Sequence, residues 1–161
     1  MATQTATRAT PSLSSRDMVA GELQSTLVEL IDLALQGKQA HWNLVGPNFR
    51  PLHLQLDEMV DEYRAWSDLV AERMVAIGLP ADGRAQTIAS AEAVQPFPAG
   101  EVSDRDVLKM FVDRLSTVGD RVRDRVNTLG EPDPTSQDIL IQVVHGLDKQ
   151  LWMIRAQLAG R

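Results

Sequence analysis

The side chains most able to bind a metal ion lie between residues 41 and 72. They are two of the three histidines and three carboxylates: His41, His53, Asp57, Asp68 and Glu72. Imidazole nitrogen combined with carboxylate oxygen is a ligand set that suits iron, manganese or zinc. Zinc sites built on cysteine are excluded because the chain contains no cysteine. These five residues are therefore the candidate metal ligands.

Four of the candidate ligands form two pairs with helical spacing. His53 and Asp57 are four residues apart, as are Asp68 and Glu72, so each pair lies on one face of a helix. Asp57 and Asp68 are eleven residues apart, close to three turns, so both pairs face the same way. At a rise of ~1.5 Å per residue, these two carboxylates are about 16 Å apart along the helix axis. One chain therefore cannot bring both pairs to one metal ion.

The two pairs are also symmetric about the point between Glu62 and Tyr63. If two copies of this helix met antiparallel across a two-fold axis there, the first pair of one chain would face the second pair of the other. The metal site would then lie between subunits and occur twice in each dimer. The alternative is that these residues are the solvated face of an amphipathic helix. His41, beside Trp42 at the end of a largely apolar helix, argues against that alternative.

Four long amphipathic helices are expected to position these side chains. Apolar residues recur at three- and four-residue steps in four segments: 17–45, 51–77, 103–129 and 133–161. Strand signals are absent, so the predicted fold class is all-α. The connection over residues 79–100 is long for a compact domain, and its run at 87–94 predicts one short helix. A long connection between the second and third helices indicates a four-helix bundle of the crossover type.

Particular residues mark the ends of these helices. Gly46 and the proline after it stop the first helix. Ser103 begins the third helix, with Asp106 three residues later in the pattern of a capping box. Asp133 and Pro134 supply the N-cap and the first-turn proline of the fourth helix.

The overall composition predicts one compact soluble domain preceded by a tail. A length of 161 residues with 43% hydrophobic content suits one domain, expected over residues 17–161. Residues 1–16 are rich in Thr and Ser without an acid, so we expect a flexible, weakly basic tail. The apolar runs are far shorter than the ~18 residues that span a bilayer. No signal-peptide core is present, so a cytoplasmic location is expected, beside the nucleoid if the tail binds DNA.

The candidate ligands also carry a family resemblance, extending over residues 20–158. The chain is similar to the signature of the Dps family, the miniferritins of starved bacteria, at Lys38-Gln39-Ala40-His41-Trp42-Asn43, Gly46, Asn48-Phe49, Leu52-His53, Asp57, Asp68 and Ala71-Glu72-Arg73. Asp148-Lys149 and Trp152 resemble the fourth-helix motif of that family. No glutamate stands three residues before a histidine, so the di-iron site inside the bundle of ordinary ferritins is missing.

The resemblance implies a ferritin-like bundle assembled as a hollow homo-dodecamer, with the short helix at the dimer interface. It implies that Fe(II) is oxidised, preferentially by hydrogen peroxide, at ferroxidase centres between two-fold related subunits. The ferric mineral would be stored in the cavity, protecting the cell and its DNA. His41, His53 and Asp57 would come from one chain and Asp68 and Glu72 from its partner. Zinc or manganese would be alternative occupants of the same site.

The resemblance also assigns supporting roles near the centre. Trp42 would sit beside it and could donate an electron that quenches radicals. The alternative is that Trp42 is a core aromatic, which is compatible with that role. Arg73 and Asp148 match positions expected to form a pair that orients the ligand helix. Arg73 could equally be an exposed neighbour of Glu72. Lys38, one turn before the first ligand, is expected to orient a ligand as well.

An iron pathway and a DNA contact complete the expectations. Acids before the last helix line a three-fold pore in this family, and Glu131, Asp133 and Asp138 occupy the matching region. The alternative is that the two aspartates serve the helix start, as N-cap and first-turn acid.

The net charge of −6 argues against a dedicated nucleic-acid binder. Arg8 and Arg16 could still contact DNA non-specifically, because twelve weak tails would act multivalently and with strong salt dependence. A tail that binds no partner is the alternative to weak DNA binding, and the sequence favours neither. The competing function is a non-specific DNA-compacting nucleoid protein in which iron oxidation is secondary.

Overall fold

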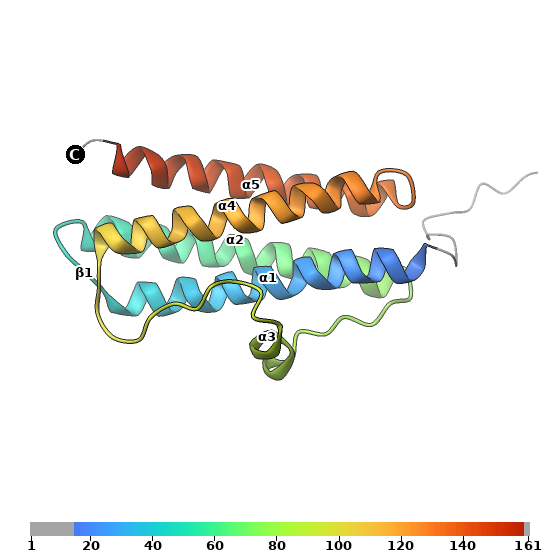
Figure 1. The fold of residues 1–161 in the computed structure, drawn as a ribbon, viewed down its shortest axis with the longest axis horizontal. Coiled ribbons are helices and arrows are strands. Elements are labelled where there is room, and N and C mark those ends of the chain that lie inside the picture. The colour runs from blue at the N-terminus through green and yellow to red at the C-terminus, as the bar shows by residue number, and fades with distance from the viewer. Residues whose placement is uncertain (1–14, 160–161) are drawn as a thin grey trace, which may run out of the picture.

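The computed structural model describes residues 15–159, which form a four-helix bundle with one short helix outside it (Figure 1). The elements in chain order are α1 (Arg16–Asn43), β1 (Leu44–Val45), α2 (Phe49–Ala76), α3 (Ala85–Ala91), β2 (Val102–Ser103), α4 (Asp104–Leu129) and α5 (Pro134–Leu158). The predicted all-α class, a four-helix bundle with a short extra helix in the connection between its second and third long helices, is confirmed. Over the described residues, no helix is long and apolar enough to cross a membrane.

The four long helices form two antiparallel pairs, α1 with α2 and α4 with α5 (Figure 1). The connection between α2 and α4 runs the length of the bundle, and α3 lies on this connection beside α1. This route makes α4 run parallel to α2, which is the crossover arrangement that the long connection predicted.

The core lies between these pairs and is built from the apolar stripes of the four helices. Tyr63 and Phe111 are its largest fully buried side chains. Burying one such side chain stabilises a fold by about 1.5–3 kcal/mol. Helices α1 and α2 come especially close at Gly37, where an added Cβ would lie 2.5 Å from Cγ2 of Val60. This close approach fixes α1 against the helix that carries four of the five candidate ligands.

The predicted helix starts are confirmed. The Ser103 hydroxyl accepts the backbone N–H of Asp106 at 3.1 Å and donates to its carboxylate at 2.8 Å. Asp133 caps α5 by accepting the backbone N–H of Ser136 at 3.3 Å, and Pro134 is the first helical residue.

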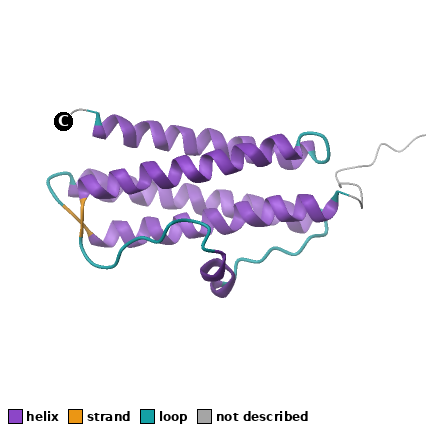
Figure 2. Ribbon diagram, viewed as in Figure 1, coloured by secondary structure: helices purple, strands orange, loops and turns teal. Residues whose placement is uncertain are grey.

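One local prediction was wrong. Helix α1 ends at Asn43 rather than near Val45, because Leu44 and Val45 pair in parallel with Val102 and Ser103 (Figure 2). Strands of two residues are too short to show an alternating pattern, so periodicity could not predict them. The short helix predicted in the connection over residues 79–100 is confirmed and covers Ala85–Ala91.

The predicted tail extends too far at its end. Arg16 is the first residue of α1, and its guanidinium donates to the carbonyls of Ile77 at 3.2 Å and Gly78 at 2.9 Å. Carbonyls at a helix C-terminus lack partners within their own helix, and an arginine is a favourable donor there. Arg16 therefore ties α1 to the end of α2 instead of belonging to a tail. Arg8 lies outside the described residues.

Candidate metal centre

His41 and His53 form a reciprocal pair across the turn between α1 and α2. Nδ1 of His41 lies 2.9 Å from the carbonyl oxygen of His53, and Nδ1 of His53 lies 2.9 Å from the carbonyl oxygen of His41. The rings stack with centroids 3.6 Å apart. Because a carbonyl oxygen can only accept, each Nδ1 must carry the proton. In the neutral rings, Nε2 therefore keeps its lone pair, which is the tautomer that a metal ligand needs.

Asp57 lies beside this pair and is held by Lys38. The Lys38 ammonium donates to Oδ1 of Asp57 at 2.6 Å, and Nδ1 of His41 lies 3.3 Å from the same oxygen. The hydrogen bond from Lys38 lowers the pKa of the Asp57 carboxyl, and the positive charge of Lys38 acts in the same direction. The carboxylate is thus kept ionised, as metal binding requires. This hydrogen bond is consistent with the orienting role expected of Lys38, which stays a prediction.

Asp68 and Glu72 form the second pair, and both are exposed on α2. Between residues 15 and 159, no group of three or more His, Asp or Glu side chains is gathered closely enough to hold a metal ion. This agrees with the spacing of the two pairs, which one chain cannot unite. The assignment of all five ligands to one centre stays a prediction.

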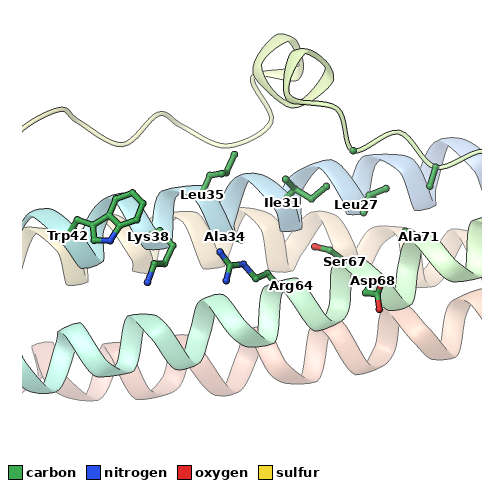
Figure 3. A pocket seen from close by; sticks show the side chains of 12 residues that line it. Leu27, Ile31, Ala34, Leu35, Lys38, Trp42, Arg64, Ser67, Asp68 and Ala71 are labelled. Carbon is green, nitrogen blue, oxygen red and sulfur yellow. The ribbon is translucent and has the colours of Figure 1, made fainter.

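An apolar groove extends from Lys38 and Trp42, near the histidine pair, to Asp68 of the second pair. It has a volume of about 510 Å³ and runs between α1 and α2 beneath the start of the crossover connection. Figure 3 shows Trp42 and Lys38 toward one end and Asp68 toward the other. Trp42 is 68% exposed and Leu35 is 59% exposed, so Trp42 is not a core aromatic of this chain. Large apolar side chains exposed along a groove mark an interaction surface.

The expected pairing of Arg73 with Asp148 was wrong. Arg73 is buried and donates to the Asp133 carboxylate at 2.7 Å and to the Ser136 hydroxyl at 2.9 Å, both at the start of α5. Asp148 lies 12 residues beyond Ser136 on the same helix and is bound by Arg123 at 3.0 Å. At ~1.5 Å per residue, Asp148 lies about 18 Å further along α5 than Ser136, which is too far to reach the same guanidinium. Burial also excludes Arg73 as an exposed neighbour of the ligands.

The three acids expected at a pore divide into two groups. Asp133 is 4% exposed, caps α5 and pairs with Arg73, so its carboxylate is unavailable to line an open channel. Glu131 and Asp138 are exposed at the same end of the bundle. The pore prediction was therefore wrong for Asp133, where the alternative of an N-cap is confirmed, and it stays a prediction for the other two.

Two further contacts near the centre were not foreseen. The Phe49 ring stacks on the His53 ring with centroids 5.0 Å apart. Asp104 reaches from the start of α4 to the turn between α1 and α2, where its carboxylate accepts the backbone N–H of Asn48 at 2.8 Å. In the sequence, Asp104 is indistinguishable from an acid that merely favours a helix N-terminus.

Comparison with known proteins gives three consistent results. A ferritin-like domain family matches residues 20–160. DNA protection during starvation protein 2 of Deinococcus radiodurans is 40% identical over 136 residues, which cover 84% of this chain but only 56% of that relative. DNA protection during starvation protein of Agrobacterium fabrum is 34% identical over 146 residues, which cover 90% of each chain.

Solved structures agree with these relatives. Dps92 from Deinococcus radiodurans is similar with a TM-score of 0.89 and 36% identity, covering 92% of this chain and 90% of that one. Dps from Microbacterium arborescens in its high iron form is similar with a TM-score of 0.87 and 35% identity, covering 94% and 99%. Because a domain model matches most of the chain, one relative is matched over 90% of its length and the fold is shared, the chain belongs to the Dps family of ferritin-like proteins.

Proposed function

We propose that this protein oxidises Fe(II), preferentially with hydrogen peroxide, at centres shared between two subunits, and stores the ferric product in a dodecameric cage. The observation that carries the proposal is the reciprocal bonding of His41 and His53, which directs both Nδ1 protons into the protein. Two imidazoles held in this tautomer beside an ionised carboxylate make half of a metal centre. The membership of the chain in a ferritin-like family favours iron as the metal.

A second copy of the chain would supply the other half. Asp68 and Glu72 are exposed on the same helix as His53, and the groove beside them exposes large apolar side chains. An antiparallel partner across the middle of α2 would cover that groove and bring the two carboxylates to the histidine pair. Each two-fold contact would then contain two equivalent centres.

The ligand set suits a change of iron oxidation state. Imidazole nitrogen binds Fe(II) well, and the hard carboxylate oxygens of Asp57, Asp68 and Glu72 stabilise Fe(III) as it forms. Two Fe(II) ions each give one electron to one hydrogen peroxide molecule. The O–O bond breaks and two protons are taken up, so the products are two Fe(III) ions and two water molecules. Iron and peroxide are consumed together, which removes the reactants that form hydroxyl radicals.

The charge of the chain supports storage as well as oxidation. With a net charge of −6, twelve copies would form a strongly anionic shell that attracts Fe(II). The exposed carboxylates of Glu131 and Asp138, near the start of α5, are the proposed lining of an iron pathway. A similar protein has been solved in a high iron form, which favours iron as the cargo of this chain.

The proposal is tested by stopped-flow measurement of Fe(II) oxidation by peroxide. His41→Ala and Asp68→Ala should each slow oxidation at least about tenfold, because each removes a ligand from every centre. His145→Ala and Asp120→Ala remove an exposed histidine from α5 and an exposed acid from α4, so they are matched controls that should keep the wild-type rate. Unchanged rates in both ligand variants would refute the centre. Repeating the series with oxygen tests the preference for peroxide.

Mixing the two ligand variants tests whether each centre is shared. In a dimer that combines one His41→Ala chain with one Asp68→Ala chain, both defects fall on one centre and the other is intact. Random mixing makes about half of all pairs mixed, so the mixture should recover about a quarter of the wild-type rate. Centres contained within one chain would give no recovery.

The names of the relatives refer to protection of DNA, so protection of DNA is the second candidate function, and direct binding is the form of it that we propose to test. Because Arg16 is committed to the end of α2, the basic side chain left in the predicted tail is Arg8. We therefore place non-specific DNA compaction second. A gel-shift series across salt concentrations tests it, since binding to phosphates would weaken steeply as salt rises.

A further inference from the structure

We propose that Asp104 is a positioning residue for the metal centre. It holds the turn between α1 and α2 and, through that turn, sets His41 and His53 against each other. This inference rests on the proposed function, because it assigns a supporting residue to the same centre. Asp104 is distant in sequence from every candidate ligand, and it reaches the centre because the crossover connection returns the start of α4 to this end of the bundle (Figure 1).

The Asp104 carboxylate is buried and engaged on both oxygens. Asp104 is 6% exposed, and its Oδ2 accepts the backbone N–H of Asn48 at 2.8 Å. Oδ1 accepts the backbone N–H of Arg105 at 2.7 Å. A buried carboxylate is costly unless hydrogen bonds compensate for lost hydration, and here two backbone donors and a helix N-terminus do so. The hydrogen bond to Asn48 is the one that crosses from α4 to the turn.

The turn is shaped around this carboxylate. Gly46 has φ +136°, and a Cβ added there would lie 2.6 Å from Cγ of Asp104. Glycine is thus required both for the backbone conformation and for the space that the carboxylate occupies. The strands beside it, with Leu44 opposite Val102, bring the end of the crossover connection to the same turn. The carboxylate and the turn therefore fit each other as one unit.

The turn leads directly to the histidine pair. Asn48 precedes Phe49, whose N–H donates to the carbonyl of Gly46 at 3.1 Å and whose ring stacks on His53. His53 and His41 are then joined by two hydrogen bonds of 2.9 Å. Such bonds weaken as the two atoms separate beyond ~3.2 Å, so a shift of a few tenths of an ångström at the turn is enough to loosen them. A metal centre needs its ligands held within ~0.5 Å.

The test uses Co(II) as the probe and the metal-free full-length protein. Asp104→Ala removes both acceptors, so the dissociation constant for Co(II) should rise about tenfold or more. Asp104→Asn keeps one oxygen that can accept the Asn48 N–H, so binding should return to within about threefold of wild type. Ser103→Ala is the matched control, since it removes the side-chain cap of the same helix and keeps the backbone pairing of residue 103 with Val45. It should lower the melting temperature and leave Co(II) affinity unchanged.

Hydrogen exchange gives a readout that needs no metal. In a peptide covering residues 44–52, the amide of Asn48 should exchange faster in Asp104→Ala, return toward wild type in Asp104→Asn and stay protected in Ser103→Ala. Wild-type exchange and Co(II) affinity in Asp104→Ala would overturn the inference. Equal loss of affinity in Ser103→Ala would also overturn it, because loss of helix stability would then suffice.

Two further variants separate the failures. His41→Ala should weaken Co(II) binding; if it does and Asp104→Ala does not, the inference fails while the proposed centre stands. If His41→Ala binds as tightly as wild type, both fail. Should Asp104→Ala not fold, Asp104→Ser carries the test, because its hydroxyl ends one bond short of the carboxylate oxygen that accepts the Asn48 N–H. Weakened Co(II) binding there supports the inference, and unchanged binding overturns it.

Discussion

Replacing Asp133 by alanine should lower the free energy of unfolding by roughly 4–6 kcal/mol. One oxygen of its carboxylate accepts from the Arg73 guanidinium at 2.7 Å and from the backbone N–H of Ser136 at 3.3 Å. The other oxygen accepts from the Ser136 hydroxyl. The side chains of Arg73 and Asp133 are only 7% and 5% exposed, so solvent screens this pair very little.

The magnitude follows from two losses. Removing one partner of a buried ion pair costs about 3–5 kcal/mol, because the remaining charge stays buried without its counterion. Replacing an N-cap aspartate by alanine costs about 1 kcal/mol more, since the first turn of α5 loses an acceptor. Together these losses are a large fraction of the ~5–15 kcal/mol by which domains are ordinarily stable.

Urea unfolding at one fixed protein concentration is the assay, because assembly contributes to apparent stability. Asp138→Ala is the matched control: it removes an exposed acid from the same helix and should change stability by less than about 0.5 kcal/mol. In the double variant Arg73→Met with Asp133→Ala, no buried charge is left, so about half of the loss should be recovered. A loss below about 1 kcal/mol in Asp133→Ala alone would refute the reasoning.

Three further outcomes are expected. Lys38→Met should weaken Co(II) binding about tenfold, measured by titration, because Asp57 loses the cation that orients it; unchanged affinity would contradict this role. Arg114→Met should speed hydrogen exchange across residues 94–97, because Arg114 donates to the carbonyls of Gln95 and Pro96 in that segment. Exchange as slow as in the wild type would show that these hydrogen bonds do not hold the segment. Hydrogen bonds from Arg84 lower the pKa of the Asp82 carboxyl. The contribution of Asp82 to the free energy of unfolding is therefore full above pH ~3.8 and disappears as pH falls through the pKa of the folded protein. The melting-temperature difference between wild type and Asp82→Asn should shrink on acidification, and a constant difference would exclude this linkage.

Local chemistry made most of the fold predictable. Ser103 and Asp133 are polar groups that satisfy backbone N–H groups at a helix start, and this interaction lies within three residues of sequence. The apolar stripes likewise depend only on the period of the helix. The strand pair of Leu44 with Val102 depends instead on two segments 58 residues apart, so no local pattern announces it.

The candidate centre was predictable to the level of residue type and helix face. Spacing placed His53 and Asp57 on one face, but it carried no information on the ring nitrogens or on the backbone carbonyls that they bond. Arg73 shows the same limit at longer range. Its partner depends on how α5 is positioned along α2, and periodicity alone leaves Asp133, Asp138 and Asp148 available as partners.

The placement of the supporting contacts explains how a single helix would carry both halves of the proposed shared centre. Near its start, α2 is bound through Asn48 by Asp104 at the beginning of α4. In its last turn, Arg73 is bound by Asp133 at the beginning of α5. The pair of helices α4 and α5 thus holds α2 at both ends from one side, which leaves the opposite face, with its exposed carboxylates and apolar groove, free to meet a second copy. Because the ends are held by separate contacts, damage at Asp104 should weaken the histidine half of each centre, whereas damage at Asp133 should act first on the carboxylate half.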